Sequence, residues 1–184
     1  GFKEGSKSLT TPGEKPKEIS LAELDSTRAT KYRAAVARGN YMSQDRSDVQ
    51  YAMKELSRGM SKPTEEDWEK LKRLGRYLKD KLRSQILFEY QGRVSKIMVW
   101  TDTDYAGCVK TRKSTSGGVI MIGGHMIKSW SSTQNTIALS SGEAALTAMV
   151  KCSCESIGMV QLAADWSLTY EAEIYVDSSA ALDE

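Results

Sequence analysis

Three carboxylates in the second half of the chain stand where secondary structure is expected to begin or end. Asp102 closes the apolar run 97–101, Asp177 closes the shorter run 174–176, and Glu143 opens a long helical pattern. Two strand ends and one helix start can bring distant acids to a single edge of a sheet. Acids gathered there repel one another and bind divalent cations. The pattern therefore predicts a two-metal site that cleaves phosphodiesters.

Plainer interpretations of these acids stay open. Each of them, taken singly, is also explained as a surface acid at the end of a strand or helix. Asp104 competes with Asp102, because strand alternation points both side chains to the same side of the sheet. Metal-dependent hydrolysis needs no Ser, Cys or His nucleophile, and the single histidine, His125, follows a Gly-Gly turn. Trp100 and Trp130 lie in expected strands, and we expect both in the core.

The composition describes a globular chain whose charge is unevenly distributed. Of its 184 residues 40% are hydrophobic, and no apolar run approaches the roughly 18 residues that span a bilayer. Three cysteines and no secretory signal predict reduced thiols in an intracellular protein, cytoplasmic or nuclear. Residues 1–92 hold 19 Lys and Arg against 14 Asp and Glu, and residues 93–184 hold 7 against 10. That asymmetry suits a protein that binds a polyanion and metal ions, or simply a solvated helical surface.

Periodicity and capping signals predict helices first and a sheet afterwards. We expect helices at 27–42, 48–60, 65–82 and 139–163, a further helix from Ser178, and strands at Ile86–Tyr90, Val94–Thr101, Gly118–Ile122, Met126–Ser131 and Glu173–Asp177. Ser47 with Gln50, and Thr64 with Asp67, have the spacing of helix-capping pairs. From residue 94 the order is β-β-β-α-β-α, which indicates an α/β protein with a mixed sheet.

Five ordered strings carry a family resemblance. They are residues 100–108, 111–117, 129–134, 138–144 and 176–181. Together they closely resemble the ribonuclease H domain of copia-type retrotransposon Pol polyproteins. The stretch upstream, from about residue 30, resembles the segment of the same polyprotein that joins the reverse transcriptase to the ribonuclease H.

The resemblance implies a fold, a division into domains and an activity. The fold would be ribonuclease H-like, with a flexible leader over 1–26, a helical connection over 27–84 and the ribonuclease H-like domain over 85–184, truncated at its C-terminus. The activity would be endonucleolytic hydrolysis of the RNA strand of RNA/DNA hybrids during reverse transcription. Two Mg²⁺ ions, for which Mn²⁺ can substitute, would be held by Asp102, Glu143 and Asp177.

Nucleic-acid contacts are expected from two places in the chain. The loop 110–118 mixes cations, hydroxyls and glycines, which suit phosphate and sugar groups, and the helix at 65–82 has a basic surface. The residues expected to bind are Arg112, Lys113, Ser114, Thr115, Ser116, Gln134, Lys72 and Arg76. An ordinary hairpin connection and a solvated helix face are the alternatives. The expected partners are the RNA/DNA hybrid and the reverse transcriptase portion of the same polyprotein, with no membrane.

Two departures from the family pattern put hydrolysis by this chain in question. The family usually carries a second Glu after the acid that opens the helix, and this chain has Ala145 there. The family also completes its site with a fourth acid in a later segment, and this sequence ends at Glu184. A catalytically incomplete hybrid-binding or structural module is therefore the second hypothesis. A decayed fragment that folds poorly is the third.

Overall fold

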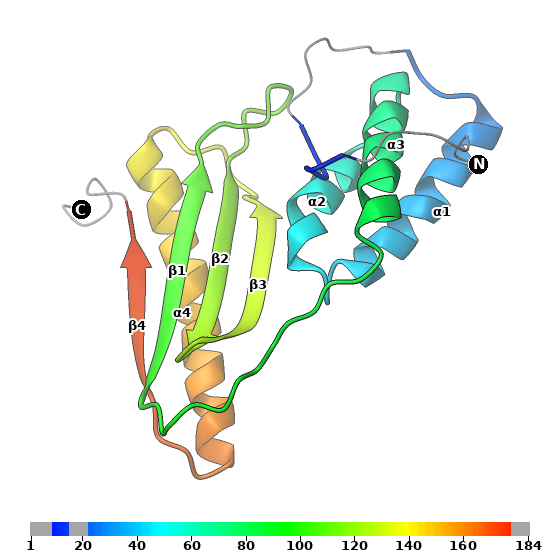
Figure 1. Cartoon of the computed structure of the whole chain (residues 1–184). Helices are drawn as coiled ribbons and strands as arrows, with labels where there is room; N and C mark the ends of the chain where they lie inside the picture. Colours follow the sequence, from blue (N-terminus) through cyan, green and yellow to red (C-terminus); the bar gives the residue numbers. More distant parts are fainter. Residues whose placement is uncertain (1–8, 15–21, 178–184) are drawn as a thin grey trace. The chain divides into compact units, whose positions relative to one another are not determined.

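The computed structural model describes residues 9–14 and 22–177 of the chain. The chain divides into two compact units, residues 1–86 and 87–184, and each is described by itself below (Figure 1). The domain boundary expected at residues 84 and 85 lies close to this division. The helix expected from Ser178 lies outside the described residues.

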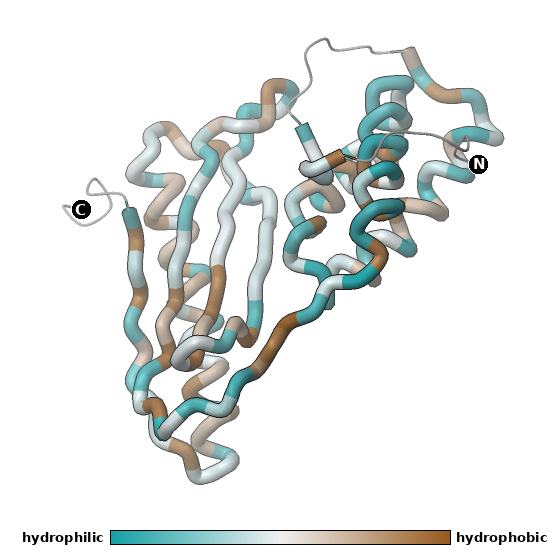
Figure 2. The backbone as a smooth tube through the Cα atoms, in the orientation of Figure 1, coloured by the Kyte–Doolittle hydropathy of each residue, from teal (hydrophilic) through white to brown (hydrophobic). Residues whose placement is uncertain are grey.

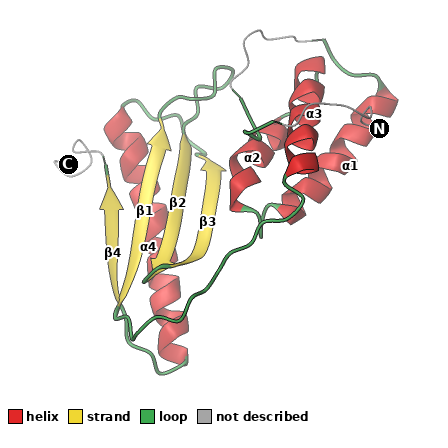
Figure 3. Cartoon of the chain, in the orientation of Figure 1, coloured by secondary structure: helices red, strands yellow, loops and turns green. Residues whose placement is uncertain are grey.

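The first unit is helical (Figure 3). It contains α1 (Ser26–Met42), the short 3-10 helix η1 (Ser47–Val49), α2 (Gln50–Arg58) and α3 (Glu65–Asp80). Its core forms where the apolar sides of these helices meet, and includes Tyr32, Val36, Val49, Met53, Leu56, Leu74 and Tyr77. Tyr32 is fully buried and donates its hydroxyl hydrogen bond to the carbonyl oxygen of Leu56 at 2.6 Å. The three helices expected from periodicity are thus all present.

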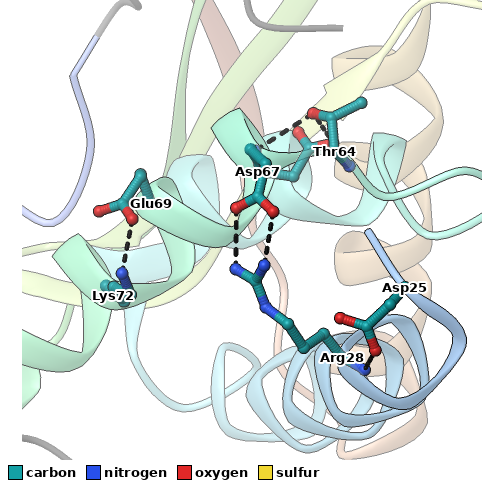
Figure 4. Close-up of polar contacts among 7 residues, drawn as sticks. Asp25, Arg28, Thr64, Asp67, Glu69 and Lys72 are labelled. Carbon is teal, nitrogen blue, oxygen red and sulfur yellow. Dashed lines mark hydrogen bonds and ion pairs between the residues drawn. The ribbon is translucent and has the colours of Figure 1, made fainter. Parts of the chain in front are cut away.

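Of the two helix-capping pairs predicted from the sequence of this unit, one is present. Thr64 and Asp67 form a reciprocal capping box at the start of α3, with the Thr64 N–H 3.0 Å from the Asp67 carboxylate (Figure 4). That prediction is confirmed. The pair Ser47 and Gln50 forms no such box, because residues 47–49 make the 3-10 turn η1 and α2 begins after Val49 without a side-chain cap.

Polar contacts fasten the described parts of the expected leader to the helices. Arg73 on α3 donates to the hydroxyl of Thr11 at 2.8 Å and pairs with Glu14 at 2.7 Å. The Leu24 N–H donates to the Pro63 carbonyl at 2.9 Å, just before α1 begins. These described stretches therefore have defined contacts with the helices, and the flexible leader expected over residues 1–26 stays a prediction.

Asp48 provides a test of pH dependence in the helical unit. Its carboxylate accepts from the Arg46 guanidinium at 2.8 and 2.7 Å and from the Tyr77 hydroxyl at 2.7 Å. The Arg46 bonds, followed by the Tyr77 bond, hold the pKa of Asp48 below its ordinary value. A carboxylate with a lowered folded pKa stabilises the fold above its unfolded pKa, and this contribution is lost as the pH falls through the folded pKa.

We therefore expect Asp48→Asn to lower the free energy of unfolding by about 1–2 kcal/mol at pH 7. The difference from the unmodified chain should begin to shrink as the pH falls below the ordinary aspartate pKa of about 3.9, and should be lost as the pH falls through the lowered pKa of folded Asp48. Urea denaturation between pH 3 and pH 7 measures this difference in the free energy of unfolding. Asp45→Asn is the matched control, since Asp45 is exposed and its side chain makes no hydrogen bond or ion pair among the described residues. An equal loss at every pH would contradict the assignment.

The second unit is a mixed sheet covered by one long helix. Its elements are β1 (Lys96–Asp104), β2 (Thr115–Ile122), β3 (His125–Thr133), α4 (Ser141–Asp165) and β4 (Glu171–Val176). The strands lie in the order β3-β2-β1-β4, with β1 parallel to β4 and the other pairs antiparallel. The expected α/β class with a mixed sheet is confirmed, and the arrangement is compatible with a ribonuclease H-like fold.

The prediction of a strand at Ile86–Tyr90 is wrong. Residues 81–95 form an irregular link from α3 to β1, in which Figure 2 shows an apolar stretch between hydrophilic ones. This stretch pairs with no strand of the described residues, and Tyr90 is fully open to solvent. Gln91 fastens the link to the sheet by donating to the Ile122 carbonyl at 3.0 Å and accepting from the Gly124 N–H at 2.9 Å, and the Phe88 ring meets the His125 ring edge-on at 5.1 Å. A run of β-favouring residues without a partner strand therefore stays irregular.

Helix α4 packs one side on the sheet through small residues. Its buried positions are Gly142, Ala144, Ala145, Ala148, Cys152, Ser156 and Ala163. Cys152 joins Ile97, Val99 and Ile120 in the core, and burial raises the pKa of its thiol. The opposite side of α4 is also apolar and exposes Leu146, Val150 and Ile157. Among the described residues, no helix is both long and apolar enough to cross a membrane.

Candidate active site

Strand alternation in β1 separates core residues from candidate site residues. Val99 and Thr101 are buried on the side that α4 covers. Trp100, which lies between them, and Asp102, which follows them, are exposed on the other side. Asp102 pairs with Gly117 of β2, whose missing side chain leaves the space beside the carboxylate open. The register of β1 thus presents Asp102 to solvent near the end of its strand.

Asp102 and Asp177 meet in one groove. The parallel pairing of β1 with β4 ends at Thr101 opposite Val176, so the two aspartates are the next residues on neighbouring strands. Both line a cavity of about 460 Å³ on the sheet side away from α4, together with Trp100, Gly117 and Tyr175. The structure therefore brings together two of the three acids expected from the sequence.

The structure also separates Asp102 from its rival Asp104. The Asp104 carboxylate lies over the turn that follows β1, where a Cβ on Gly107 would come within 1.9 Å of its Oδ2 atom. Asp102 accepts a hydrogen bond from the Thr103 N–H at 2.6 Å and faces the groove. Asp104 therefore shapes the loop, and Asp102 is the acid that shares a cavity with Asp177.

Glu143 lies outside the groove that Asp102 and Asp177 share. In the first turn of α4 its carboxylate accepts from the Leu139 N–H at 2.7 Å, while its own N–H donates to the Ser140 hydroxyl at 3.0 Å. Glu143 thus caps the helix that it was expected to open. Within residues 9–14 and 22–177, no three His, Cys, Asp or Glu side chains are grouped so that they could hold a metal ion. Glu143 does not join the pair in the groove.

Most of the polar residues expected to bind nucleic acid in this unit are buried. Ser114, Thr115, Ser116 and Gln134 are each less than one tenth exposed. Ser114 accepts from the Ala106 N–H at 3.0 Å and so holds the loop together. The hairpin turns these four side chains inward, and their contact with nucleic acid stays a prediction. Arg112 and Lys113 remain accessible in the loop.

Gln134 joins three elements at the edge of the sheet where β1 ends. Its side-chain amide donates to the Ser116 hydroxyl at 2.9 Å and to the Ala144 carbonyl at 2.8 Å, and its backbone N–H donates to the Ser114 carbonyl at 2.9 Å. Through these bonds Gln134 fixes the first turn of α4 against β2.

On α3, Lys72 and Arg76 lie beside an apolar hollow. The hollow measures about 920 Å³ and is lined by Trp68, Leu71 and Leu78 among others. Lys72 pairs with Glu69 one turn earlier at 2.5 Å (Figure 4), so its charge is partly compensated. Arg76 has no carboxylate partner among the described residues. Of the two expected cations, Arg76 is therefore the freer one.

One feature of the groove was missed by reasoning from the sequence. Trp100 and Tyr175 stack across β1 and β4 with their ring centroids 5.3 Å apart, and they are 40% and 42% exposed. The expectation that Trp100 belongs to the core is wrong, whereas Trp130 does pack against it. The signal was present, because Trp100 and Asp102 are two residues apart in a strand and must share a face.

Comparison with curated proteins shows which family the chain belongs to. Over 179 residues, 95% of this chain, it is 33% identical to the retrovirus-related Pol polyprotein from transposon RE1 of Arabidopsis thaliana. It is 32% identical over 155 residues to the corresponding polyprotein from transposon RE2 of the same plant, and 31% identical over 139 residues to that from transposon TNT 1-94 of Nicotiana tabacum. The chain belongs to the copia-type Pol polyproteins.

Within these Pol polyproteins the chain corresponds to a short part. It spans 12% of the RE1 polyprotein and 10% of each of the other two. No protein-family model matches the chain, and no solved structure matches it. The relationship to the Pol polyproteins therefore rests on similarity along the sequence, and activities of the whole polyprotein do not follow from it directly.

Proposed function

We propose that residues 87–177 belong to a ribonuclease H module that acts on RNA/DNA hybrids during reverse transcription of a retrotransposon. The single observation that carries this proposal is the Asp102–Asp177 pair in one groove at the end of two parallel strands. The kinship with Pol polyproteins supports it, since hybrids arise when such an element is copied. The reverse transcriptase portion of the same polyprotein is the proposed protein partner.

Divalent cations are part of the proposal, with Mg²⁺ as the natural ion and Mn²⁺ as a substitute. Two carboxylates suit one hard cation. The pair of ions expected from the sequence, however, has no full ligand set among the described residues, because Glu143 is engaged with Leu139. The residues present therefore do not fit a two-ion site as they stand.

Hybrid binding is proposed to use the cations of the loop after β1. In this loop Arg112 is exposed and Lys113 is half-buried, and Arg112 adopts a left-handed backbone conformation with φ of 57°. Phosphate contacts release counterions, so the affinity for the hybrid should fall steeply with added salt. Arg76 on α3 is a further proposed contact. A flat salt dependence would count against all three residues.

Cleavage of a labelled RNA/DNA hybrid in Mg²⁺ and in Mn²⁺ tests the assignment of Asp102. We expect Asp102→Asn to reduce cleavage by about 100-fold or more, because it removes a charge from the pair that holds the cation. Asp104→Asn is the matched control and should retain most of the activity, since Asp104 lies over the loop. Equal losses in the two variants would contradict the assignment.

Binding without hydrolysis is the second candidate function. The capping role of Glu143 favours it, since a carboxylate bonded to the Leu139 N–H is withheld from the groove. In that case the chain would bind the hybrid with the expected salt dependence and leave its RNA strand intact in both cations. The same assay therefore separates the two candidates.

A further inference from the structure

We propose that the contact between Gln91 and His125 is a pH-sensitive latch. It holds the link of residues 81–95 on the sheet while His125 is neutral, and releases the link when His125 is protonated. Both residues belong to the α/β unit, Gln91 within the link and His125 at the start of β3. Figure 1 shows the link running from α3 to the start of β1. The inference does not depend on the proposed function.

The turn between β2 and β3 fixes the orientation of the Gln91 side-chain amide. Its Nε2 atom donates to the Ile122 carbonyl at 3.0 Å, and its Oε1 atom accepts from the Gly124 N–H at 2.9 Å. A carbonyl oxygen only accepts and a backbone N–H only donates, so exchanging Oε1 and Nε2 would break both bonds. The amide also lies against Gly123, where an added Cβ would overlap it. Gln91 therefore presents Nε2, a donor, to His125.

The fixed amide determines the protonation state of His125 in the latched link. The Gln91 Nε2 atom lies 3.0 Å from the His125 Nδ1 atom. Because Nε2 of an amide only donates, Nδ1 must accept, which requires the neutral ring with its proton on the other nitrogen. Protonation of the ring places an N–H on Nδ1 as well. Two donors then face each other at hydrogen-bond distance, and the contact becomes repulsive.

Few other contacts hold the link on the sheet. Within residues 82–94, the hydrogen bonds to the sheet among the described residues are those of Gln91. The Phe88 ring meets the His125 ring edge-on, with the ring centroids 5.1 Å apart, but Phe88 remains 56% exposed. His125 thus contacts both residues that attach the link. A change in its charge acts on the two contacts together.

The charges around His125 do not compensate its protonated form. His125 is half-buried, so a proton reaches it from solvent, and no described Asp or Glu forms an ion pair with it. The charged and titratable groups of the surrounding elements are Glu89 and Arg93 of the link, Tyr170 before β4, and the ion pairs Lys96–Glu173 and Lys128–Glu155. The exposed Glu89 and Arg93 are of opposite sign, and the other four charges are already paired. Protonated His125 therefore gains no ionic partner that would keep the latch closed.

Release of the latch lengthens the part of the chain that is free to act as a tether after α3. With the latch closed, the first sheet contact after α3 is made by Phe88. With the latch open, the next is made by the Ser95 carbonyl, which accepts from the Glu171 N–H at 3.0 Å. The free tether then grows from residues 81–87 to residues 81–94. The reach of a flexible chain scales with the square root of its length, so it increases about 1.4-fold.

The test uses the full chain labelled with 4-fluorophenylalanine and followed by ¹⁹F NMR between pH 5.5 and pH 8. The sequence contains two phenylalanines, and Phe88→Leu identifies the signal of Phe88. As the pH falls through the range in which histidine titrates, we expect this signal to move toward its position in Gln91→Ala, which lacks the latch. The ratio of released to latched chain should rise by up to about tenfold per pH unit, the limit for a single proton. An unchanged ratio would overturn the proposal.

A second measurement separates release of the link from a local change in the charge of the His125 ring. Chymotrypsin cleavage within residues 82–90 is compared with cleavage of Gln91→Ala at the same pH, which cancels the pH dependence of the protease. We expect the unmodified chain to be cleaved more slowly than Gln91→Ala at pH 8 and at a similar rate at pH 5.5. A ¹⁹F shift without this change in cleavage would mean that the link stays attached, and would contradict the latch.

Two variants test the roles of the donor and the acceptor. In His125→Asn the amide oxygen can accept from Gln91 at every pH, so the link should stay attached throughout. Gln91→Glu should reverse the direction, because a carboxylate accepts from protonated His125 and has no donor for the neutral Nδ1 atom. A transition in His125→Asn like that of the unmodified chain would overturn the proposal. If the Asn side chain is too short to close the latch, Gln91→Glu decides, and release at low pH in that variant would overturn it.

Discussion

Gly118→Ala should destabilise the α/β unit by about 2–3 kcal/mol, the cost of overpacking a dense core. Gly118 is buried in β2 on the side that α4 covers, and it pairs with Trp130 of β3. A Cβ at this position would lie 2.1 Å from the indole Cζ2 atom of Trp130 and 2.5 Å from its Cε2 atom. A rigid ring cannot yield to such a contact by rotating its far end. Trp130 must therefore move, and with it the contact that its ring makes with Lys151 of α4.

Gly117→Ala is the matched control for this prediction. Gly117 is the preceding residue and faces the groove, where the nearest atom to an added Cβ is the Asp102 carbonyl oxygen at 3.8 Å. The substitution should be neutral, or stabilising by up to about 1 kcal/mol, because alanine has less conformational freedom in the unfolded chain. Urea denaturation followed by hydrogen exchange of peptides from β1 and β2 measures both variants. A greater loss in Gly117→Ala than in Gly118→Ala would contradict the assignment of the two faces.

Tyr32→Ala should cost the helical unit about 3–5 kcal/mol, as expected when a large aromatic side chain is removed from a core. Tyr32 is fully buried among α1, α2 and α3, and burial raises the pKa of its hydroxyl well above the ordinary value. The same hydroxyl donates to the Leu56 carbonyl at 2.6 Å. The loss should appear in hydrogen exchange of peptides from residues 26–80.

Tyr32→Phe separates the ring from the hydroxyl in this measurement. It keeps the packing and removes one hydrogen bond, so the expected loss is about 1 kcal/mol. The Leu56 carbonyl retains the Gly59 N–H as a donor, at 3.1 Å, which limits the penalty for the acceptor. Similar losses in the two variants would mean that the hydroxyl, and not the ring, holds the core together.

The helices were predictable because their signals are local. The periodic run at 27–42 matches α1, and the Thr64–Asp67 spacing alone identifies the start of α3. The long helix was expected from residue 139 and begins at Ser141, because Ser140 serves as the N-cap. The strand expected at Ile86–Tyr90 failed for the opposite reason. Whether a β-favouring run becomes a strand depends on a partner that is distant in sequence.

The candidate site was predictable where it depends on strand topology. Asp102 and Asp177 each follow an apolar run, and parallel neighbours end at the same edge of a sheet. The role of Glu143 was harder to predict, because a carboxylate in the first turn of a helix can serve as a metal ligand or as a cap. Its spacing from Ser140 is that of a capping pair, but this spacing does not by itself exclude a ligand. The inward turn of Ser114 and Gln134 depends on how the hairpin folds over α4, which composition does not encode.

The parallel pairing of β1 with β4 also sets the order in which the groove can form during synthesis. The strands β1, β2 and β3 are consecutive along the chain and can pair as each leaves the ribosome. Asp177 reaches Asp102 only after α4 has crossed the sheet and β4 has docked, a contact between residues distant in sequence that forms slowly. Until that step the groove of a nascent chain has only one of its two aspartates, so binding of the proposed cation would be among the last events of its folding.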